Sequence, residues 1–157
     1  MHASAQPVDA AMGAKAKVSS VASAGPAVGA PGETLTTHVD LTIDSGWKMY
    51  AMDSPPPSRG VAIRFDELPG GLSQTGPVQQ ETPQRGYDPN FQKTVTYFEG
   101  TAHLWADFTI APDAAPGERT VTGAVEYMIC NDDMCYPPVR QPFDVTLTVT
   151  EPQAASA

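Results

Sequence analysis

Apolar and polar residues alternate with a period of two along five stretches of this 157-residue chain. Such a period places every second side chain on a buried face and the others toward solvent, as in a β-strand packed on one side. The five stretches cover residues 35–43, 61–65, 102–110, 121–129 and 143–149. Clusters of Gly, Pro, Asp and Ser separate them, and the 16 prolines argue against long helices. The pattern predicts an all-β chain, an antiparallel β-sandwich of the immunoglobulin type.

The two ends of the chain differ in composition from its centre. Residues 1–30 are mostly Ala, Ser, Gly, Val and Pro without a sustained period, so we expect a flexible leader or the remnant of a cleaved signal segment. Residues 31–150 form the expected domain, in which 72–96 are expected to be a long loop with at most one edge strand. Residues 151–157 are expected to be a linker or tail. No stretch reaches the roughly 20 apolar residues that a membrane-spanning helix needs.

The chain is acidic, with 18 Asp and Glu against 9 Lys and Arg and a formal net charge of -9. Binding to nucleic acid or to an anionic membrane surface requires clustered Lys and Arg, so the composition argues against both. An acidic surface favours solubility and steers the protein toward basic patches on a partner. The sequence itself calls for no state beyond a monomer.

The chain has two cysteines, Cys130 and Cys135, with four residues between them. A strand pattern leads up to Cys130, turn-forming residues follow it, and the next strand pattern begins near Phe143. Directly opposed residues of an antiparallel pair have Cα atoms about 4.5–5.5 Å apart. A disulfide requires about 4.4–6.8 Å. The spacing therefore favours a disulfide across a hairpin-like corner, in a protein of an oxidising compartment.

A structural cross-link and a reversible redox pair are both consistent with this spacing. Closing a ring of about six residues constrains the unfolded chain by only about 2 kcal/mol, whereas a loop of about 100 residues gives nearer 4.7 kcal/mol. The small ring argues against a mere cross-link, and a permanent bridge in a non-catalytic immunoglobulin-like interaction module stays open as the alternative. Asp132 and Asp133 lie between the cysteines and disfavour a thiolate. We therefore expect exchange to require a docked partner.

Metal binding is a weaker hypothesis for the same segment. Zinc would require four Cys or His ligands, and the three histidines are far apart in sequence, at positions 2, 38 and 103. Met128 and Met134 flank the cysteines and would make a soft copper site with them, but methionine more often fills gaps in a core. We expect no metal and no other cofactor, and we expect His103 to be a solvated surface residue.

Three motifs resemble one known family. The sequence CNDDMCYPP (130–138) is similar to the cysteine motif of the N-terminal periplasmic domain of the thiol:disulfide interchange protein DsbD. GWKMY (46–50) resembles a strand-turn element of that family, and YDPNF (87–91), followed by Tyr97, resembles its cap loop. The motifs occur in the family's order and span about residues 33–150. The family pattern has five residues between the cysteines, one more than this chain.

The resemblance implies a thiol:disulfide interchange enzyme component with an immunoglobulin-like fold in the periplasm, either alone or as part of an inner-membrane protein. Electrons would arrive from the thioredoxin-like domain of a membrane thiol reductase. They would leave toward periplasmic disulfide isomerases and the thioredoxin-like proteins of cytochrome c maturation. Cys135 would form the mixed disulfide with partners, and Cys130 would resolve it.

The resemblance also implies a cap loop that shields the sulfurs until a partner lifts it. Phe91 is the best match to the covering aromatic and Tyr87 the second, and the less favoured alternative for Phe91 is an ordinary loop anchor packed on the sandwich edge. Asp88 matches an acidic cap position that would disfavour the thiolate, and its alternative role is to begin the Asp-Pro turn. The remaining expected site-shaping residues are Trp47, Tyr50, Tyr136 and Pro137. For Trp47 and Tyr50, packing in the core or at a sheet edge is an equal alternative.

Overall fold

The computed structural model describes residues 18–24 and 28–152 of the chain. In this part the secondary structure consists of strands, and no helix is long and apolar enough to cross a membrane. The strands are β1 (Val18–Ala24), β2 (Val28–Gly29), β3 (Thr34–Ile43), β4 (Lys48–Tyr50), β5 (Ala62–Phe65), β6 (Leu72–Gln80), β7 (Gln84–Asp88), β8 (Lys93–Phe98), β9 (Thr101–Ile110), β10 (Gly117–Tyr127), β11 (Ile129–Cys130) and β12 (Val139–Val149).

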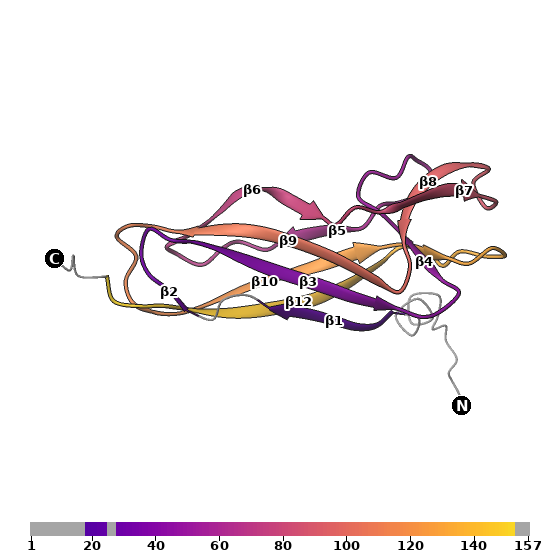
Figure 1. Cartoon of the computed structure of the whole chain (residues 1–157). Helices are drawn as coiled ribbons and strands as arrows, with labels where there is room; N and C mark the ends of the chain where they lie inside the picture. The colour runs from indigo at the N-terminus through magenta and orange to yellow at the C-terminus, as the bar shows by residue number, and fades with distance from the viewer. Residues whose placement is uncertain (1–17, 25–27, 153–157) are drawn as a thin grey trace, which may run out of the picture.

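Two four-stranded sheets, ordered β1-β3-β9-β6 and β2-β12-β10-β5, pack face to face as a sandwich (Figure 1). A third sheet, ordered β11-β4-β8-β7, lies at one end of the sandwich, where β4, β7 and β8 are grouped in Figure 1. All strand pairs are antiparallel except β2 with β12. The predicted immunoglobulin-like β-sandwich is confirmed.

The core follows from the alternation. In β9 every second residue is buried, and the residues between them are partly or fully exposed. The same alternation runs through β12 from Phe143 to Val149. The buried positions of facing strands form the sandwich interior, which includes Leu41, Leu104, Phe108, Tyr127 and Leu147. Each such side chain contributes about 1.5–3 kcal/mol by leaving water, so the pattern that predicts the strands also stabilises the two sheets against each other.

The structure corrects the expected leader and the expected long loop. Within residues 1–30, β1 pairs with β3 and β2 pairs with β12, so the sheets begin before residue 31. Residues 1–17 of the expected leader and 153–157 of the expected tail lie outside the described residues. Within residues 72–96, β6 pairs with β9, and β7 pairs with β8.

Both errors concern strands that the period of two does not reveal. The sequence of β1, VSSVASA, has few large apolar residues, and backbone pairing along an edge requires none. β6 also lies at a sheet edge, most of its side chains are exposed, and its register shifts between Thr75 and Gln79, where Gly76 and Pro77 lie. A proline and a register shift are tolerated at an edge because no further strand needs those hydrogen bonds.

Candidate functional site

The two cysteines lie where the chain leaves the sandwich for the third sheet. β10 ends at Tyr127, and β11 then pairs with β4, which places Cys130 opposite Lys48. Cys130 and Cys135 form an isolated antiparallel bridge and are joined by a disulfide, with their Cα atoms 4.0 Å apart. The predicted disulfide across a corner is therefore present, at a Cα separation slightly below the expected range.

Asn131 holds the turn between the cysteines. Its side-chain Oδ1 accepts hydrogen bonds from the backbone N–H groups of Asp133 and Met134, both at 2.8 Å. Its own N–H donates to the Met134 carbonyl at 2.9 Å. These bonds are what the short side chain of Asn provides in a tight turn, and they set the register in which the cysteines face each other.

The two cysteines differ in exposure. Cys130 is fully buried, with an exposed fraction of 0%, and packs with the buried residues Tyr50 and Val95. Cys135 is partly exposed. Between them, Met134 at the tip of the turn is 42% exposed. Another molecule can therefore contact part of Cys135, whereas no part of Cys130 is exposed.

The loop between β7 and β8, residues 89–92, contacts the cysteine site, and we call it the cap loop. Phe91 is half-buried in the apolar cluster around Cys130, and its ring meets the Tyr50 ring edge-to-face at 5.7 Å between centroids. The Asn90 side-chain Nδ2 donates to the Asn131 carbonyl at 2.7 Å, which links the cap loop to the cysteine turn.

Asp88 anchors the base of the cap loop and has an exposed fraction of 0%. Its carboxylate accepts a hydrogen bond from the Tyr50 hydroxyl and others from the N–H groups of Asn90, at 2.7 Å, and Phe91, at 3.4 Å. The Lys48 ammonium lies 3.7 Å from the same carboxylate. A buried carboxylate is tolerated only with such partners, so Asp88 fixes the cap loop to the strand that underlies Cys130.

The other site residues expected from the sequence do not all meet at the sulfurs. Trp47 stacks on Tyr136 with ring centroids 5.1 Å apart, and both pack against the main core. Tyr87, near the end of β7, is 65% exposed, and Pro137 is also exposed. Tyr50, Asp88 and Phe91 are the expected residues that the fold brings to Cys130.

Sequence reasoning missed Lys48, which is buried between charged and aromatic groups. Its ammonium lies 4.0 Å from the exposed Asp132 and 5.2 Å from the centre of the Tyr97 ring, in addition to the contact with Asp88. A lysine between Trp47 and Met49 in an otherwise apolar strand was the signal, because a buried ammonium requires a carboxylate nearby.

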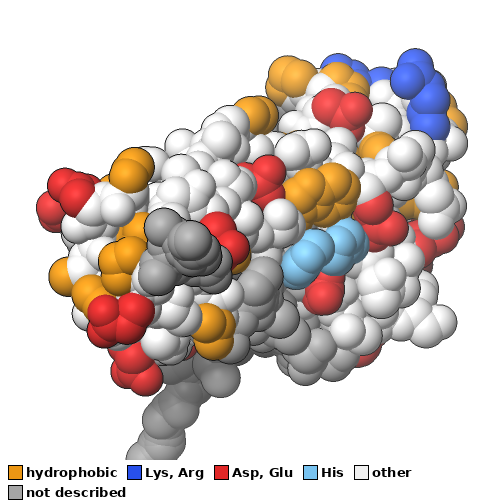
Figure 2. Space-filling model, turned by 60° about the vertical axis from the view of Figure 1, so that its left-hand side comes forward, with side chains coloured by type: hydrophobic (Ala, Val, Ile, Leu, Met, Phe, Trp, Pro, Cys, Tyr) orange, Lys and Arg blue, Asp and Glu red, His pale blue; other side chains and the backbone are white. Residues whose placement is uncertain are grey.

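His38 and His103 are neighbours in space although they are far apart in the sequence. His38 Nδ1 and His103 Nε2 are 3.3 Å apart, the rings stack, and His103 pairs with Asp40. Histidine side chains are visible in pale blue in the middle of the face shown in Figure 2. Among the described residues, no group of three His, Cys, Asp or Glu is arranged to hold a metal ion. His2 lies outside the described residues.

Two buried tyrosines should make the fold sensitive to alkaline pH. Burial raises the pKa of Tyr127 from near 10 to about 12. Burial, the hydrogen bond to Asp88 and the charge of that carboxylate raise the pKa of Tyr50 further. Above pH 10 the unfolded chain loses these protons while the folded chain keeps them. The free energy of unfolding is therefore expected to fall by about 1.4 kcal/mol per pH unit for each tyrosine.

Urea unfolding between about pH 9.5 and 11.5 measures this slope. Tyr127→Phe should remove about half of it, and Tyr87→Phe, at an exposed position, should leave it unchanged. An equal slope in the wild type and in Tyr127→Phe would contradict the assignment.

The family model of the N-terminal part of the thiol:disulfide interchange protein DsbD matches residues 15–147. Among solved structures, a cohesin module from a Clostridium perfringens family 33 glycoside hydrolase is similar with a TM-score of 0.55 and 7% identity, over 86% of this chain and 98% of that one. The DsbD N-terminal domain of Neisseria meningitidis in the reduced form has a TM-score of 0.49 and 20% identity, over 82% and 88%.

The N-terminal periplasmic domain of ScsB from Proteus mirabilis has a TM-score of 0.48 and 10% identity, over 80% of this chain and 43% of that one. No curated protein matches the chain. At these identities, the likeness to the cohesin module bears on the sandwich fold alone.

Proposed function

This chain belongs to the family of the N-terminal domain of the thiol:disulfide interchange protein DsbD, and on that premise we propose that it carries electrons in the periplasm through a reversible Cys130–Cys135 disulfide. The thioredoxin-like domain of a membrane thiol reductase would supply the electrons. Thioredoxin-like proteins of disulfide isomerisation or cytochrome c maturation would receive them.

The observation that carries this proposal is the unequal exposure of the two cysteine residues in a small ring at the end of the sandwich. A permanent cross-link gains nothing from a partly exposed member, and a ring of this size adds only about 2 kcal/mol to stability. An exchange pair, by contrast, requires one sulfur that a partner can reach and one that is held back until a mixed disulfide exists. Cys135 and Cys130 meet these two requirements.

The reduced protein would work in two steps. The Cys135 thiolate attacks one sulfur of a target disulfide, and the other target sulfur leaves as a thiolate. Cys130 then attacks the Cys135 sulfur, which releases the target as a dithiol and closes the Cys130–Cys135 bridge. Two electrons have passed to the target, and the same steps in reverse, with a reduced thioredoxin-like domain, reload the pair.

The cap loop would control access to this chemistry. Phe91, anchored through Asp88 and packed on Tyr50, would exclude small oxidants from the reduced pair, and a docking partner would displace it. The buried charge of Asp88 would oppose a thiolate on either cysteine until that moment. Both residues would thus keep the pair unreactive outside a complex.

The reduction potential distinguishes exchange from a permanent bridge. We expect a value above about -300 mV, because structural disulfides of secreted proteins lie below it. Equilibration with glutathione or dithiothreitol buffers, followed by alkylation and mass analysis, measures the potential. A value well below that limit would assign the bridge to a non-catalytic interaction module and overturn the proposal.

A further inference from the structure

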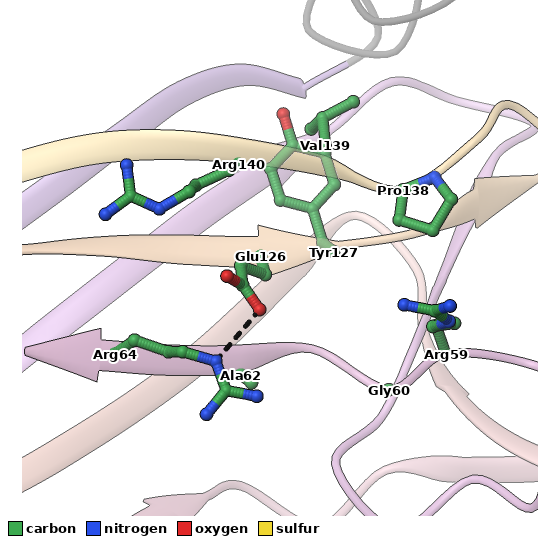
Figure 3. A pocket seen from close by; sticks show the side chains of 9 residues that line it. All are labelled: Arg59, Gly60, Ala62, Arg64, Glu126, Tyr127, Pro138, Val139 and Arg140. Carbon is green, nitrogen blue, oxygen red and sulfur yellow. Dashed lines mark hydrogen bonds and ion pairs between the residues drawn. The ribbon is translucent and has the colours of Figure 1, made fainter.

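A cavity of about 340 Å³ opens on the outer face of the sheet formed by β5, β10 and β12 (Figure 3). Arg64 and Arg140 lie at one end of it, and Glu126 lies on β10 between β5 and β12. Arg59 and Pro138 lie toward the other end. We call this cavity the arginine groove. It is not part of the cap loop or of the apolar cluster around the cysteines.

The register of the sheet explains why these side chains share a face. Glu126 is opposed by Arg140 on β12 and by Ala62 on β5, and directly opposed residues project to the same side. Arg64 lies two residues beyond Ala62 and therefore projects to that side as well. The neighbouring position on β12, Val139, is buried in the core, so this side faces solvent.

The groove is basic in a strongly acidic protein. The whole chain carries a net charge of -9, and three of its five arginines line this one cavity against a single lining carboxylate. Arg64 pairs with Glu126 at 3.1 Å, and Arg140 lies 4.0 Å from Asp66. Among the described residues, none forms an ion pair with Arg59.

The existing pairs leave the arginines available. The side chains of Arg64 and Arg140 are 69% and 56% exposed, and exposed ion pairs contribute at most about 1 kcal/mol. A guanidinium also offers several N–H donors, so it can donate to a second carboxylate while it stays paired with the first. The lining therefore has positive charge and free donors that the fold itself does not use.

The groove is close to the reactive sulfur. Its wall residue Pro138 follows Cys135 by three residues, so their Cα atoms are at most about 11 Å apart. Even a small transient redox interface covers about 600 Å² on each partner, a disc of roughly 14 Å radius. A protein whose sulfur reaches Cys135 therefore comes close enough to cover the near end of the groove.

We infer that the arginine groove receives an acidic segment of the redox partner, placed a few residues from the partner's own reactive cysteine. This inference rests on the proposed exchange function and adds the chemistry of the partner's surface to it. Carboxylates bound there would fix the partner's orientation and attract it despite the repulsion expected from the net charge of the chain.

Matched synthetic peptides test the inference. Each peptide carries one cysteine as a mixed disulfide with thionitrobenzoate, a flexible four-residue spacer, and then three Glu, three Gln or three Lys. A spacer of that length reaches up to about 14 Å, enough to span from Cys135 to the groove. The reduced chain takes up the peptide sulfur at Cys135 and releases coloured thionitrobenzoate. Cys130 then releases the peptide thiol as the bridge closes.

The arginine variant is Arg59→Gln with Arg140→Gln, which removes two positive charges. Its control is Ser73→Glu with Thr146→Glu, which lowers the net charge equally at two exposed positions away from the groove. Thr146 lies six residues along β12 from Arg140, about 20 Å in an extended strand.

At low salt, the wild type should reduce the Glu peptide about fivefold faster than the Gln peptide. The arginine variant should lose this preference, and the control should keep it. A wild type that reduces the Gln peptide but shows no preference for Glu, or a preference that survives in the arginine variant, overturns the groove inference alone. Failure to reduce even the Gln peptide, both in the wild type and in Phe91→Ala, which lacks the ring packed on the cluster around Cys130, overturns the exchange function. Self-association that the arginine variant abolishes would assign the groove to a second copy of the chain and also overturn the inference.

Discussion

Serine at position 130 is expected to give a protein that captures a disulfide substrate permanently through Cys135, whereas serine at position 135 captures almost none. Without Cys130, the mixed disulfide on Cys135 has no internal thiol to resolve it. Without Cys135, the remaining thiol is a fully buried Cys130 beneath Tyr50 and the cap loop. Reaction with an external disulfide requires an in-line approach of three sulfurs, and a sulfur with no exposed surface cannot provide one while the cap loop is closed.

Glutathione disulfide is a suitable probe because it is small and defined. Non-denaturing incubation followed by intact-mass analysis should show the glutathione adduct forming at least about tenfold faster on Cys130→Ser than on Cys135→Ser. Both variants lose the same small ring, worth about 2 kcal/mol. Cys130→Ser also places a hydroxyl in an apolar cluster, so urea unfolding should first show that both variants are folded under the assay conditions. Equal rates, or faster capture by Cys130, would contradict the assigned order of the two sulfurs.

The sandwich was predictable from the sequence because its main strands are buried on one face. In β9, the alternate residues Ala102, Leu104 and Phe108 are buried as the period of two requires. The strands β1, β2, β6 and β7 escaped prediction. They lie at sheet edges, where backbone pairing alone is sufficient, and most side chains of β6 are exposed. A period of two in the sequence appears only where one face of a strand is buried, so it does not reveal a strand without such a face.

The site was predictable only as far as its local motifs extend. The cysteine spacing indicated the bridge, and the resemblance indicated Phe91 and Asp88. The contacts between distant segments could not be predicted, because they depend on the pairing of β8 with β4 and on the packing of the cap loop against Tyr50 and Asn131. Asp88 followed by Pro89 has the sequence of a turn start, yet the fold buries its carboxylate against Lys48 and Tyr50.

Replacing Phe91 with alanine is expected to speed alkylation of the reduced protein at pH 7 by about fivefold or more. The edge-to-face contact between Phe91 and Tyr50 is worth roughly 0.5–1.5 kcal/mol, and about 1.4 kcal/mol corresponds to a tenfold change in the open fraction of the cap loop. Loss of the ring also removes its cover from the cluster around Cys130. The rate constant with iodoacetamide, followed by mass analysis, measures the effect.

Tyr87→Ala is the matched control, because it removes an aromatic ring from the same hairpin at a position that is 65% exposed. Its alkylation rate should stay within about twofold of the wild type. If both substitutions accelerate alkylation equally, the cap loop is simply loosened by any change in the hairpin. If neither does, Phe91 is a loop anchor and does not shield the sulfurs.

The pH dependence of alkylation separates shielding from charge. Phe91→Ala leaves the Asp88 carboxylate in place, so the rate should rise at every pH without moving the midpoint of the profile. Asp88→Asn removes the charge but keeps an acceptor for the N–H groups of Asn90 and Phe91, so it should move the midpoint to lower pH. The same carboxylate would then have two effects, holding the cap loop closed through hydrogen bonds and disfavouring the thiolate through its charge. If Asp88→Asn changes both the plateau rate and the midpoint, the two effects cannot be separated at Asp88. If Phe91→Ala moves the midpoint, the ring does more than shield the sulfurs.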